Sequence, residues 1–305
     1  MDEVLEEILE SMRAVQGPTA VCPLCGTGGP LFDRVDRVDY FTCPECDLIF
    51  ADPRVLAQID AGEFIRDYDD SYWLRELQSA RDRSYGSSLA RVGEALLYCT
   101  IPVKRFIDIG TGPGYLLDAL RAYLPSHSAV FHGVEKFPPE PDARSSHPNY
   151  HCADLADLAD RRMTFECGVC VEVFEHLTPD MARAMAAALW KCTVPGSLFI
   201  FNTGLTDYVR NEDRGYLDPR QRGHILAWSV TAARRVFEPL GFVVHPLPGK
   251  TWAFVVERPH EHPRAQLPMQ DRIWSAEPEN LSLLRDPAMG DVMMVLGKES
   301  ARAYG

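Results

Sequence analysis

Four cysteines near the N-terminus form two pairs whose spacing suits metal binding. Cys22 and Cys25 form the first pair and Cys43 and Cys46 the second, with a proline after the first cysteine of each pair and 17 residues between the pairs. A Cys-x-x-Cys turn presents two sulfurs on one side, and four thiolates hold zinc in a tetrahedron. Because four cysteines leave no open coordination position, we expect one structural Zn²⁺ per chain in a zinc ribbon. A disulfide or a pair of free thiols is the alternative.

A glycine-rich segment in the middle of the chain could hold a nucleotide-like ligand. Residues 106–117 read Phe-Ile-Asp-Ile-Gly-Thr-Gly-Pro-Gly-Tyr-Leu-Leu, an apolar run followed by closely spaced glycines. Glycines let the backbone turn tightly and approach a ligand without Cβ collisions. The GxGxG spacing differs from the GxGxxG of dinucleotide sites. The residues of this glycine loop are Gly110, Thr111, Gly112, Pro113 and Gly114.

Acidic residues follow the neighbouring expected strands. Glu135 ends the next strand, 21 residues after Gly114, where a carboxylate can accept hydrogen bonds from ribose hydroxyls. An ordinary exposed acid at a strand end is the alternative. Asp154 follows the third strand, with other aspartates close by, and the fourth strand runs into Glu172 and His176.

The sequence pattern predicts alternating strands and helices, with the residues named above at the ends of strands. The expected strands up to residue 202 are 103–109, 129–135, 150–152, 167–173 and 197–202, and the expected helices follow residue 115 and cover 179–192 and 230–239. Such alternation indicates a parallel sheet covered by helices on both faces. The expected strands after residue 241 are 242–245, 252–257 and 291–296, interrupted by a long surface excursion at 258–289.

The chain divides into three expected parts. Residues 1–60 would hold an N-terminal helix at 2–13 and the zinc ribbon, residues 61–100 a helical connector, and residues 101–305 the α/β domain with its insertion around 258–289. Tyr72 and Trp73 in the connector would either cover a bound ligand or simply pack. The excursion is long for a surface loop, so we interpret it as a substrate lid or an intersubunit contact, which leaves a homo-oligomer open.

Composition excludes several classes of protein. The formal net charge of −13 disfavours nucleic acid as a partner. No stretch approaches the ~18 to 20 apolar residues that a membrane-spanning helix needs. The acidic N-terminus is unlike a secretory signal peptide. We therefore expect a protein of the reducing cytoplasm, with no membrane association, where paired cysteines indicate a metal more than disulfides.

With these motifs, residues 101 to about 250 resemble the class I S-adenosylmethionine-dependent methyltransferases. The resemblance implies an α/β, Rossmann-like sheet that is mostly parallel with an antiparallel last strand, here assigned to 291–298. A small zinc-ribbon segment and helices would precede this sheet. The cysteine pairs resemble an N-terminal module found in the subset of these enzymes that modify sugars, polysaccharides and natural products. The cofactor implied is S-adenosylmethionine.

The resemblance also implies roles for single residues. The glycine loop would pass beneath the methionine and ribose portions of the cofactor, and Asp108 would position the loop or the amino group. Glu135 would hold both ribose hydroxyls, and Asp154 with Leu155 would contact adenine. Glu172 would border the methyl group.

Two histidines are candidates for the general base that a hydroxyl acceptor needs. His176 follows the fourth strand, and His224 lies just before the helix at 230–239, in a loop that should roof the substrate cleft. A histidine that merely shapes the pocket through hydrogen bonds is the alternative for each.

These features together predict methyl transfer to a small polar acceptor. O-methylation of a sugar, a glycan precursor or a secondary metabolite is the first hypothesis, and C- or N-methylation stays open. A nicotinamide-dependent oxidoreductase would need the dinucleotide glycine spacing. A non-catalytic zinc-ribbon interaction protein would need a degenerate glycine loop, whereas this loop is intact.

Overall fold

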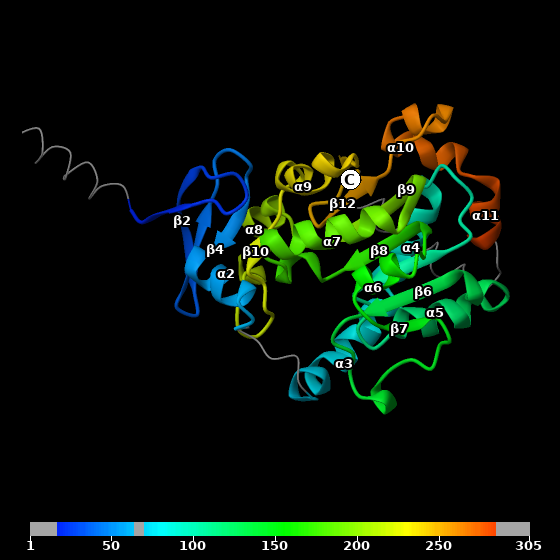
Figure 1. Cartoon of the computed structure of the whole chain (residues 1–305), viewed down its shortest axis with the longest axis horizontal. Coiled ribbons are helices and arrows are strands. Elements are labelled where there is room, and N and C mark those ends of the chain that lie inside the picture. Colours follow the sequence, from blue (N-terminus) through cyan, green and yellow to red (C-terminus); the bar gives the residue numbers. More distant parts are fainter. Residues whose placement is uncertain (1–16, 64–69, 285–305) are drawn as a thin grey trace, which may run out of the picture.

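The computed structural model describes residues 17–63 and 70–284. These residues form a seven-stranded sheet with helices on both sides, and a smaller sheet at one end of the molecule (Figure 1). The helix predicted at 2–13 and the strand predicted at 291–298 lie outside the described residues. Within these ranges, every helix is too short or too polar to span a bilayer.

The large sheet has the strand order β11-β12-β9-β8-β5-β6-β7. All its strands are parallel except β12, which runs antiparallel to both of its neighbours. This confirms the predicted fold class, and among the described residues the antiparallel strand beside β9 is β12. The strands are β5 (Phe106–Ile109), β6 (Phe131–Glu135), β7 (Tyr150–Cys152), β8 (Phe165–Val171), β9 (Thr193–Asn202), β11 (Val243–Pro246) and β12 (Ala253–Glu257).

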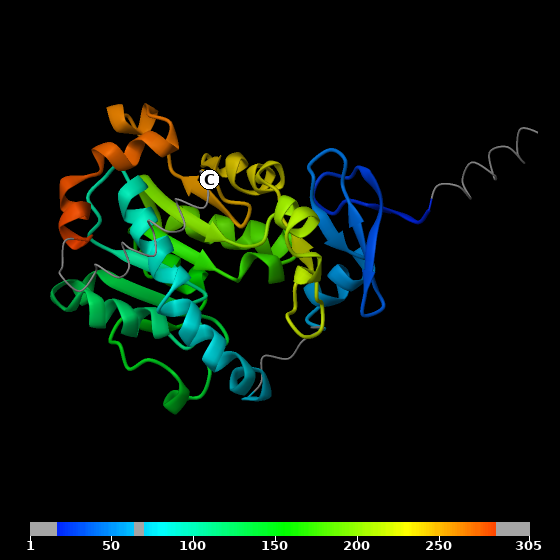
Figure 2. The same cartoon turned by 180° about the vertical axis from the view of Figure 1, so that it is seen from behind.

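Two apolar cores lie on opposite faces of this sheet. In β9, Leu198 and Ile200 belong to one core while Phe199 and Phe201 belong to the other, because successive side chains of a strand point to opposite faces. Helices α4 (Ser87–Tyr98) and α5 (Tyr115–Tyr123) cover one face (Figure 2), and α6 (Leu155–Asp160), α7 (Pro179–Lys191) and α9 (Val230–Phe237) cover the other. The predicted layered arrangement is therefore present.

Strand β8 ends two residues before the predicted end at residue 173. Glu172 has a φ of +55°, in the left-handed region that few residues other than glycine adopt. This turns the chain out of the sheet into a short 3₁₀ turn, η3 (Phe174–His176). As a result, the segment after β8, which contains Glu172 and Glu175, folds back over the edge of the sheet at which the parallel strands end.

The N-terminal sheet includes a strand that is distant in the sequence. Its order is β1-β2-β3-β4-β10, and it carries the cysteine pairs on its turns. Strand β10 follows the large sheet's β9 by more than twenty residues and pairs antiparallel with β4. The division at residues 60 and 100 stays a prediction. The strands are β1 (Thr19–Val21), β2 (Gly28–Val35), β3 (Val38–Thr42), β4 (Ile49–Ala51) and β10 (Leu226–Ala227), and α2 (Pro53–Asp60) follows β4.

The segment predicted as a surface excursion at 258–289 is helical over its described part. It contains η6 (Pro263–Gln266), α10 (Met269–Arg272), η7 (Ile273–Ser275) and α11 (Pro278–Leu284). The fully buried Asn280 accepts a hydrogen bond from the backbone N of Val103 at 2.8 Å and donates to the backbone O of Ile101 at 3.0 Å. Both partners precede β5, at the amino end of the sheet, so the described part does not form a lid over its carboxyl edge.

Candidate active site

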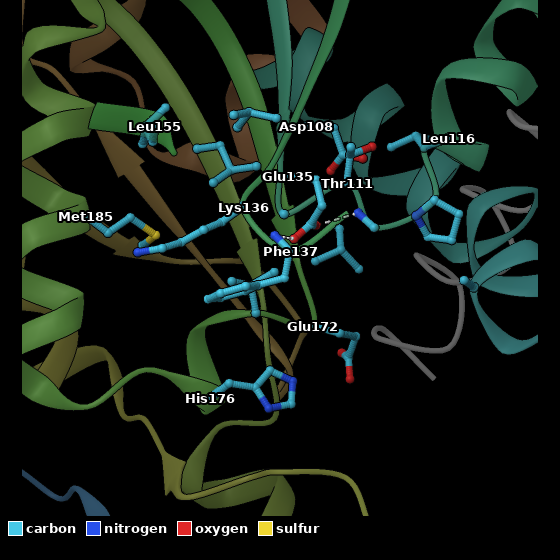
Figure 3. A pocket seen from close by; sticks show the side chains of 18 of the residues that line it. Asp108, Thr111, Leu116, Glu135, Lys136, Phe137, Leu155, Glu172, His176 and Met185 are labelled. Carbon is cyan, nitrogen blue, oxygen red and sulfur yellow. Dashed lines mark hydrogen bonds between the residues drawn. The ribbon is translucent and has the colours of Figure 1, made fainter. Parts of the chain in front are cut away.

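A cavity of about 430 Å³ opens at the carboxyl ends of β5, β6 and β8. This is the edge at which parallel α/β sheets bind their ligands. Helix α3 (Asp70–Ser84) and the start of α4 close one side, and α7 closes another. Tyr72 of the predicted connector lines the cavity, whereas the side chain of Trp73 is outside the described part of the structure. Figure 3 shows the predicted residues Asp108, Thr111, Glu135, Leu155, Glu172 and His176 around this space.

The glycine loop follows β5 in a conformation that glycine favours. The φ angles of Gly110, Gly112 and Gly114 are +72°, +56° and +77°. A Cβ atom on Gly110 would lie 2.4 Å from Cγ2 of Val173, and one on Gly114 would lie 2.6 Å from Cδ2 of Tyr150. Tyr150 also donates a hydrogen bond from its hydroxyl to the carbonyl O of Gly112 at 2.6 Å. Packing from β7 and from the segment after β8 therefore fixes the loop.

Substituting alanine for Gly114 should destabilise the fold by about 2–4 kcal/mol. The positive φ costs about 1 kcal/mol and the collision with Tyr150 a further 1–3 kcal/mol. Gly62→Ala is the matched control, because Gly62 has a φ of +90° and no atom of the described residues lies within 4 Å of its Cβ position. Urea unfolding of both variants separates backbone strain from collision. Equal losses in the two variants would contradict the close packing.

Glu135 ties the end of β6 to the glycine loop. Its carboxylate accepts hydrogen bonds from the backbone N of Gly112 at 2.8 Å and of Phe137 at 2.9 Å (Figure 3). Burial raises the pKa of this carboxyl, and these two backbone bonds oppose the shift. The carboxylate is held at the cavity wall beside the loop, and its binding of ribose hydroxyls stays a prediction.

Asp108 lies at the buried end of β5. Burial raises the pKa of its carboxyl to about 7, a hydrogen bond with Thr111 opposes this rise, and the charge of Glu135 adds to it. Five acidic residues line the cavity: Glu76, Asp108, Glu135, Asp154 and Glu172. A ligand with a positive charge would therefore be favoured there.

Asp154 and Leu155 both line the cavity, as predicted, but Asp154 also has a structural role. Its side chain accepts a hydrogen bond from the backbone N of Ala156 at 3.0 Å and caps α6. Its other oxygen lies 2.8 Å from Nζ of Lys136. Lys136 was not predicted as a site residue, and the only sequence signal for this lysine is its position directly after Glu135.

The comparisons with known proteins agree with this geometry. Residues 77–247 match the family model described as "Methyltransferase domain". The chain belongs to this family. The prediction that the chain is an S-adenosylmethionine-dependent methyltransferase is therefore confirmed. The acceptor and the methylated atom stay predictions. A search of curated proteins finds no match.

Solved structures with similar folds include several other methyltransferases. DesVI of Streptomyces venezuelae is 14% identical with a TM-score of 0.47, and the match covers 64% of this chain and 100% of DesVI. The sugar N-methyltransferase KedS8 of Streptoalloteichus is 13% identical with a TM-score of 0.45, covering 60% and 91%. Human N-acetylserotonin methyltransferase, solved in complex with S-adenosylmethionine, is 13% identical with a TM-score of 0.42, covering 62% and 58%.

The methyltransferase places its two predicted base candidates side by side. The rings of His176 and His224 pack edge to face with their centroids 5.0 Å apart. Only His176 lines the described cavity. His224 does not line the described cavity: it is buried beside His176, and its Nδ1 donates a hydrogen bond to the backbone O of Tyr216 at 2.7 Å. The position of its loop over the substrate cleft stays a prediction. Glu175 was not predicted as a site residue, although it is fully buried beside His224. Its only sequence signal is its place directly before His176.

Glu172 lines the cavity near His176 and Glu175. Burial and the nearby charge of Glu175 raise the pKa of its carboxyl to about 8, and Arg83 and His176 oppose the rise. Asn202, at the end of β9, donates a hydrogen bond to Glu172 at 3.2 Å. The side chain of Glu172 is part of the cavity wall. Its position beside the transferred methyl group stays a prediction.

The four predicted metal-binding cysteines of the methyltransferase form one cluster. Their sulfur atoms all lie within 4.8 Å of one another. The Sγ atoms of Cys22 and Cys46 are 3.7 Å apart, and those of Cys25 and Cys43 are 3.3 Å apart. A tetrahedral zinc site with Zn–S bonds of about 2.3 Å requires sulfur separations of about 3.8 Å. The residues therefore fit a zinc ion.

The cysteine-bearing sheet contacts the segment that carries His224. The hydroxyl of Tyr40 donates a hydrogen bond to the backbone O of His224 at 2.7 Å. Ser229 donates to the backbone O of Cys46 at 2.6 Å, and Arg210 donates to Asp47 at 2.6 Å. With the β4–β10 pairing, these bonds connect the cysteine cluster to the loop that carries His224.

Proposed function

We propose that the chain transfers the methyl group of S-adenosylmethionine to a hydroxyl of a small polar acceptor. A sugar, a glycan precursor or a secondary metabolite is the class of acceptor we favour. The observation that carries this proposal is the glycine loop, which lies against one wall of the cavity with Glu135 beside it and His176 across it (Figure 3).

The residues of the cavity fit the cofactor. The glycine loop lines the cavity with its backbone, and Glu135 lies where two ribose hydroxyls could be bound. Asp108 and Glu172 offer negative charge to the ammonium and sulfonium groups, and Leu155 offers an apolar surface to adenine. When bound, the cofactor supplies a methyl group on a sulfonium, a leaving group that needs no further activation.

The chain's own contribution is alignment of the acceptor and activation of its hydroxyl. Aligned reactants gain several kcal/mol over free ones. Loss of the hydroxyl proton still has to be assisted, and this role falls to the Glu175–His176–His224 cluster, whose His176 faces the cavity. His224 contributes from behind His176.

Two further assignments belong to the proposal. The cysteine cluster would hold one structural Zn²⁺, since four thiolates complete its coordination. None of the nine cysteines, all of which lie in the described residues, forms a disulfide, which suits the reducing cytoplasm predicted from the sequence. Family membership favours methyl transfer over the oxidoreductase and the non-catalytic alternatives.

The proposal is tested by following a labelled methyl group. The protein is incubated with methyl-labelled S-adenosylmethionine and a panel of nucleotide-activated sugars and hydroxylated metabolites. We expect acceptor-dependent release of S-adenosylhomocysteine, and a methyl ether in the product by mass spectrometry and NMR. Label on carbon or nitrogen would contradict O-methylation, and the absence of acceptor-dependent transfer across the panel would count against this acceptor class.

A further inference from the structure

Three metal-binding side chains from two separate segments converge behind the cavity. Glu175 and His176 lie on η3, and His224 lies in the loop before β10. One ligand atom of each residue lies within 4.8 Å of those of the other two. Nε2 of His224 is 3.8 Å from Oε1 of Glu175. The fold thus gathers two imidazoles and a carboxylate, the ligand set of many transition-metal sites.

Backbone contacts fix which nitrogen of each histidine carries its hydrogen. Nδ1 of His176 lies 3.0 Å from the carbonyl O of Gly223, and Nδ1 of His224 lies 2.7 Å from that of Tyr216. A carbonyl oxygen only accepts hydrogen bonds, so each Nδ1 is the donor. The lone pair of each neutral ring is therefore on Nε2. Metal-binding histidines usually have this arrangement, in which the other nitrogen donates to a carbonyl or carboxylate.

The carboxylate of Glu175 is buried without hydrogen bonds of its own. Its side chain has no exposed surface, and neither oxygen meets a donor at hydrogen-bond geometry within the described ranges. The hydroxyls of Thr203 and Tyr216 lie near enough to lower the pKa of this carboxyl, but burial raises it more. A second acid, Glu172, lies close by. Burying carboxylates without paired charge is costly, and a cation in the cluster would offset that cost.

We propose that Glu175, His176 and His224 bind a divalent first-row metal ion, with Zn²⁺ as the best match to two imidazoles and one carboxylate. Ligand atoms around a tetrahedral zinc ion are about 3.3 Å apart. Since the three ligand atoms lie within 4.8 Å of one another, binding requires them to approach by at most about 1.5 Å. The site is distinct from the cysteine cluster, which has four sulfur ligands.

The proposal deepens, and rests on, the proposed methyl transfer. Because His176 lines the cavity, a cation held by its Nε2 would lie next to the place of the acceptor. A metal ion at that place lowers the pKa of a coordinated hydroxyl, as it does for bound water. The histidines would then be ligands that activate the acceptor through the cation, and the proton of the coordinated hydroxyl would pass to solvent water as the oxygen gains the methyl group.

Cobalt distinguishes the two metal sites in the full-length protein. The wild-type chain is stripped of metal with a chelator and titrated with Co²⁺ while its visible spectrum is recorded. The cysteine site gives intense thiolate-to-cobalt charge-transfer bands. The proposed site gives only the weaker visible bands of nitrogen and oxygen ligands. We expect two Co²⁺ per chain, one with each signature.

Variants locate the second ion. Glu175→Gln and His224→Gln should each keep the thiolate bands and lose the weaker ones, or bind that ion at least tenfold more weakly. His127→Gln is the matched control, since His127 lies on η1 (Pro125–Val130), outside the cluster. The thiolate bands and thermal unfolding show whether each variant is folded, and if His224→Gln does not fold, Glu175→Gln decides the result alone.

A single Co²⁺ per wild-type chain, with thiolate bands only, would overturn the proposal. So would a second ion whose bands persist in the folded Glu175→Gln variant. Calorimetry with S-adenosylhomocysteine on the same samples keeps the proposed function separate. If S-adenosylhomocysteine binds but no second metal ion does, only the metal site is rejected. If S-adenosylhomocysteine does not bind, the cofactor assignment is rejected, whatever the number of metal ions.

Discussion

Glu135→Ala is expected to weaken the binding of S-adenosylhomocysteine by about 100-fold or more. Two charge-assisted hydrogen bonds to ribose hydroxyls are worth about 1.5–3 kcal/mol each, and 1.4 kcal/mol is a factor of ten in affinity. The variant also loses the bonds that join Glu135 to the backbone N of Gly112 and Phe137. Isothermal titration calorimetry measures the change.

Two further variants make this result specific. Glu135→Gln keeps the shape and one acceptor oxygen, so we expect an intermediate loss of about tenfold. Glu140→Ala removes an exposed acid outside the described cavity lining and should leave the affinity unchanged. Far-ultraviolet circular dichroism and thermal unfolding confirm the fold of each variant. An affinity of Glu135→Ala within about twofold of wild type would contradict the ribose assignment.

Cys43→Ser is expected to remove the metal of the cysteine cluster and to disorder the N-terminal sheet. Structural zinc sites contribute on the order of 10 kcal/mol to the folding of small modules. Tyr40 and β4 contact the segment from His224 to Ala227, so backbone amides in that segment should also lose protection. The described cavity lining runs only from Tyr72 to Met185, so affinity for S-adenosylhomocysteine should stay within a few-fold of wild type.

Metal analysis, amide hydrogen exchange and calorimetry on the same samples test this separation. Cys152→Ser is the matched control, because Cys152 is exposed on β7 and outside the cluster. It should keep the zinc and the protection of both segments. A folded wild-type protein purified without stoichiometric metal in the cysteine cluster would count against the zinc site. Unchanged protection of residues 224–227 in Cys43→Ser would show that the two parts are not coupled.

Local sequence signals were sufficient to predict the large sheet and the glycine loop. The apolar run at Phe106–Ile109 and the glycines after it fix a strand and a turn through their own backbone preferences. Glu135 could be placed at the cavity because strand ends of a parallel sheet meet at one edge. These predictions depend on short stretches of chain, and the structure places the predicted residues around one cavity.

Contacts between distant segments were not predictable in the same way. The burial of His224 depends on the pairing of β10 with β4, some 175 residues apart, and on the hydrogen bond from Tyr40 to the backbone O of His224. Asn280 similarly binds backbone groups near residue 101, so the described part of the 258–289 excursion packs at the amino end of the sheet. The side chains of Glu175 and Tyr40 gain their roles only from these contacts. No local pattern contains such information.

Calorimetry of the wild-type chain with S-adenosylhomocysteine tests the central claim most directly. We expect one molecule bound per chain, displaced by S-adenosylmethionine and unaffected by NADH. A titration without heat of binding over several temperatures, or tight binding of NADH in its place, would contradict the assignment of the cavity beside the glycine loop to an adenosyl cofactor.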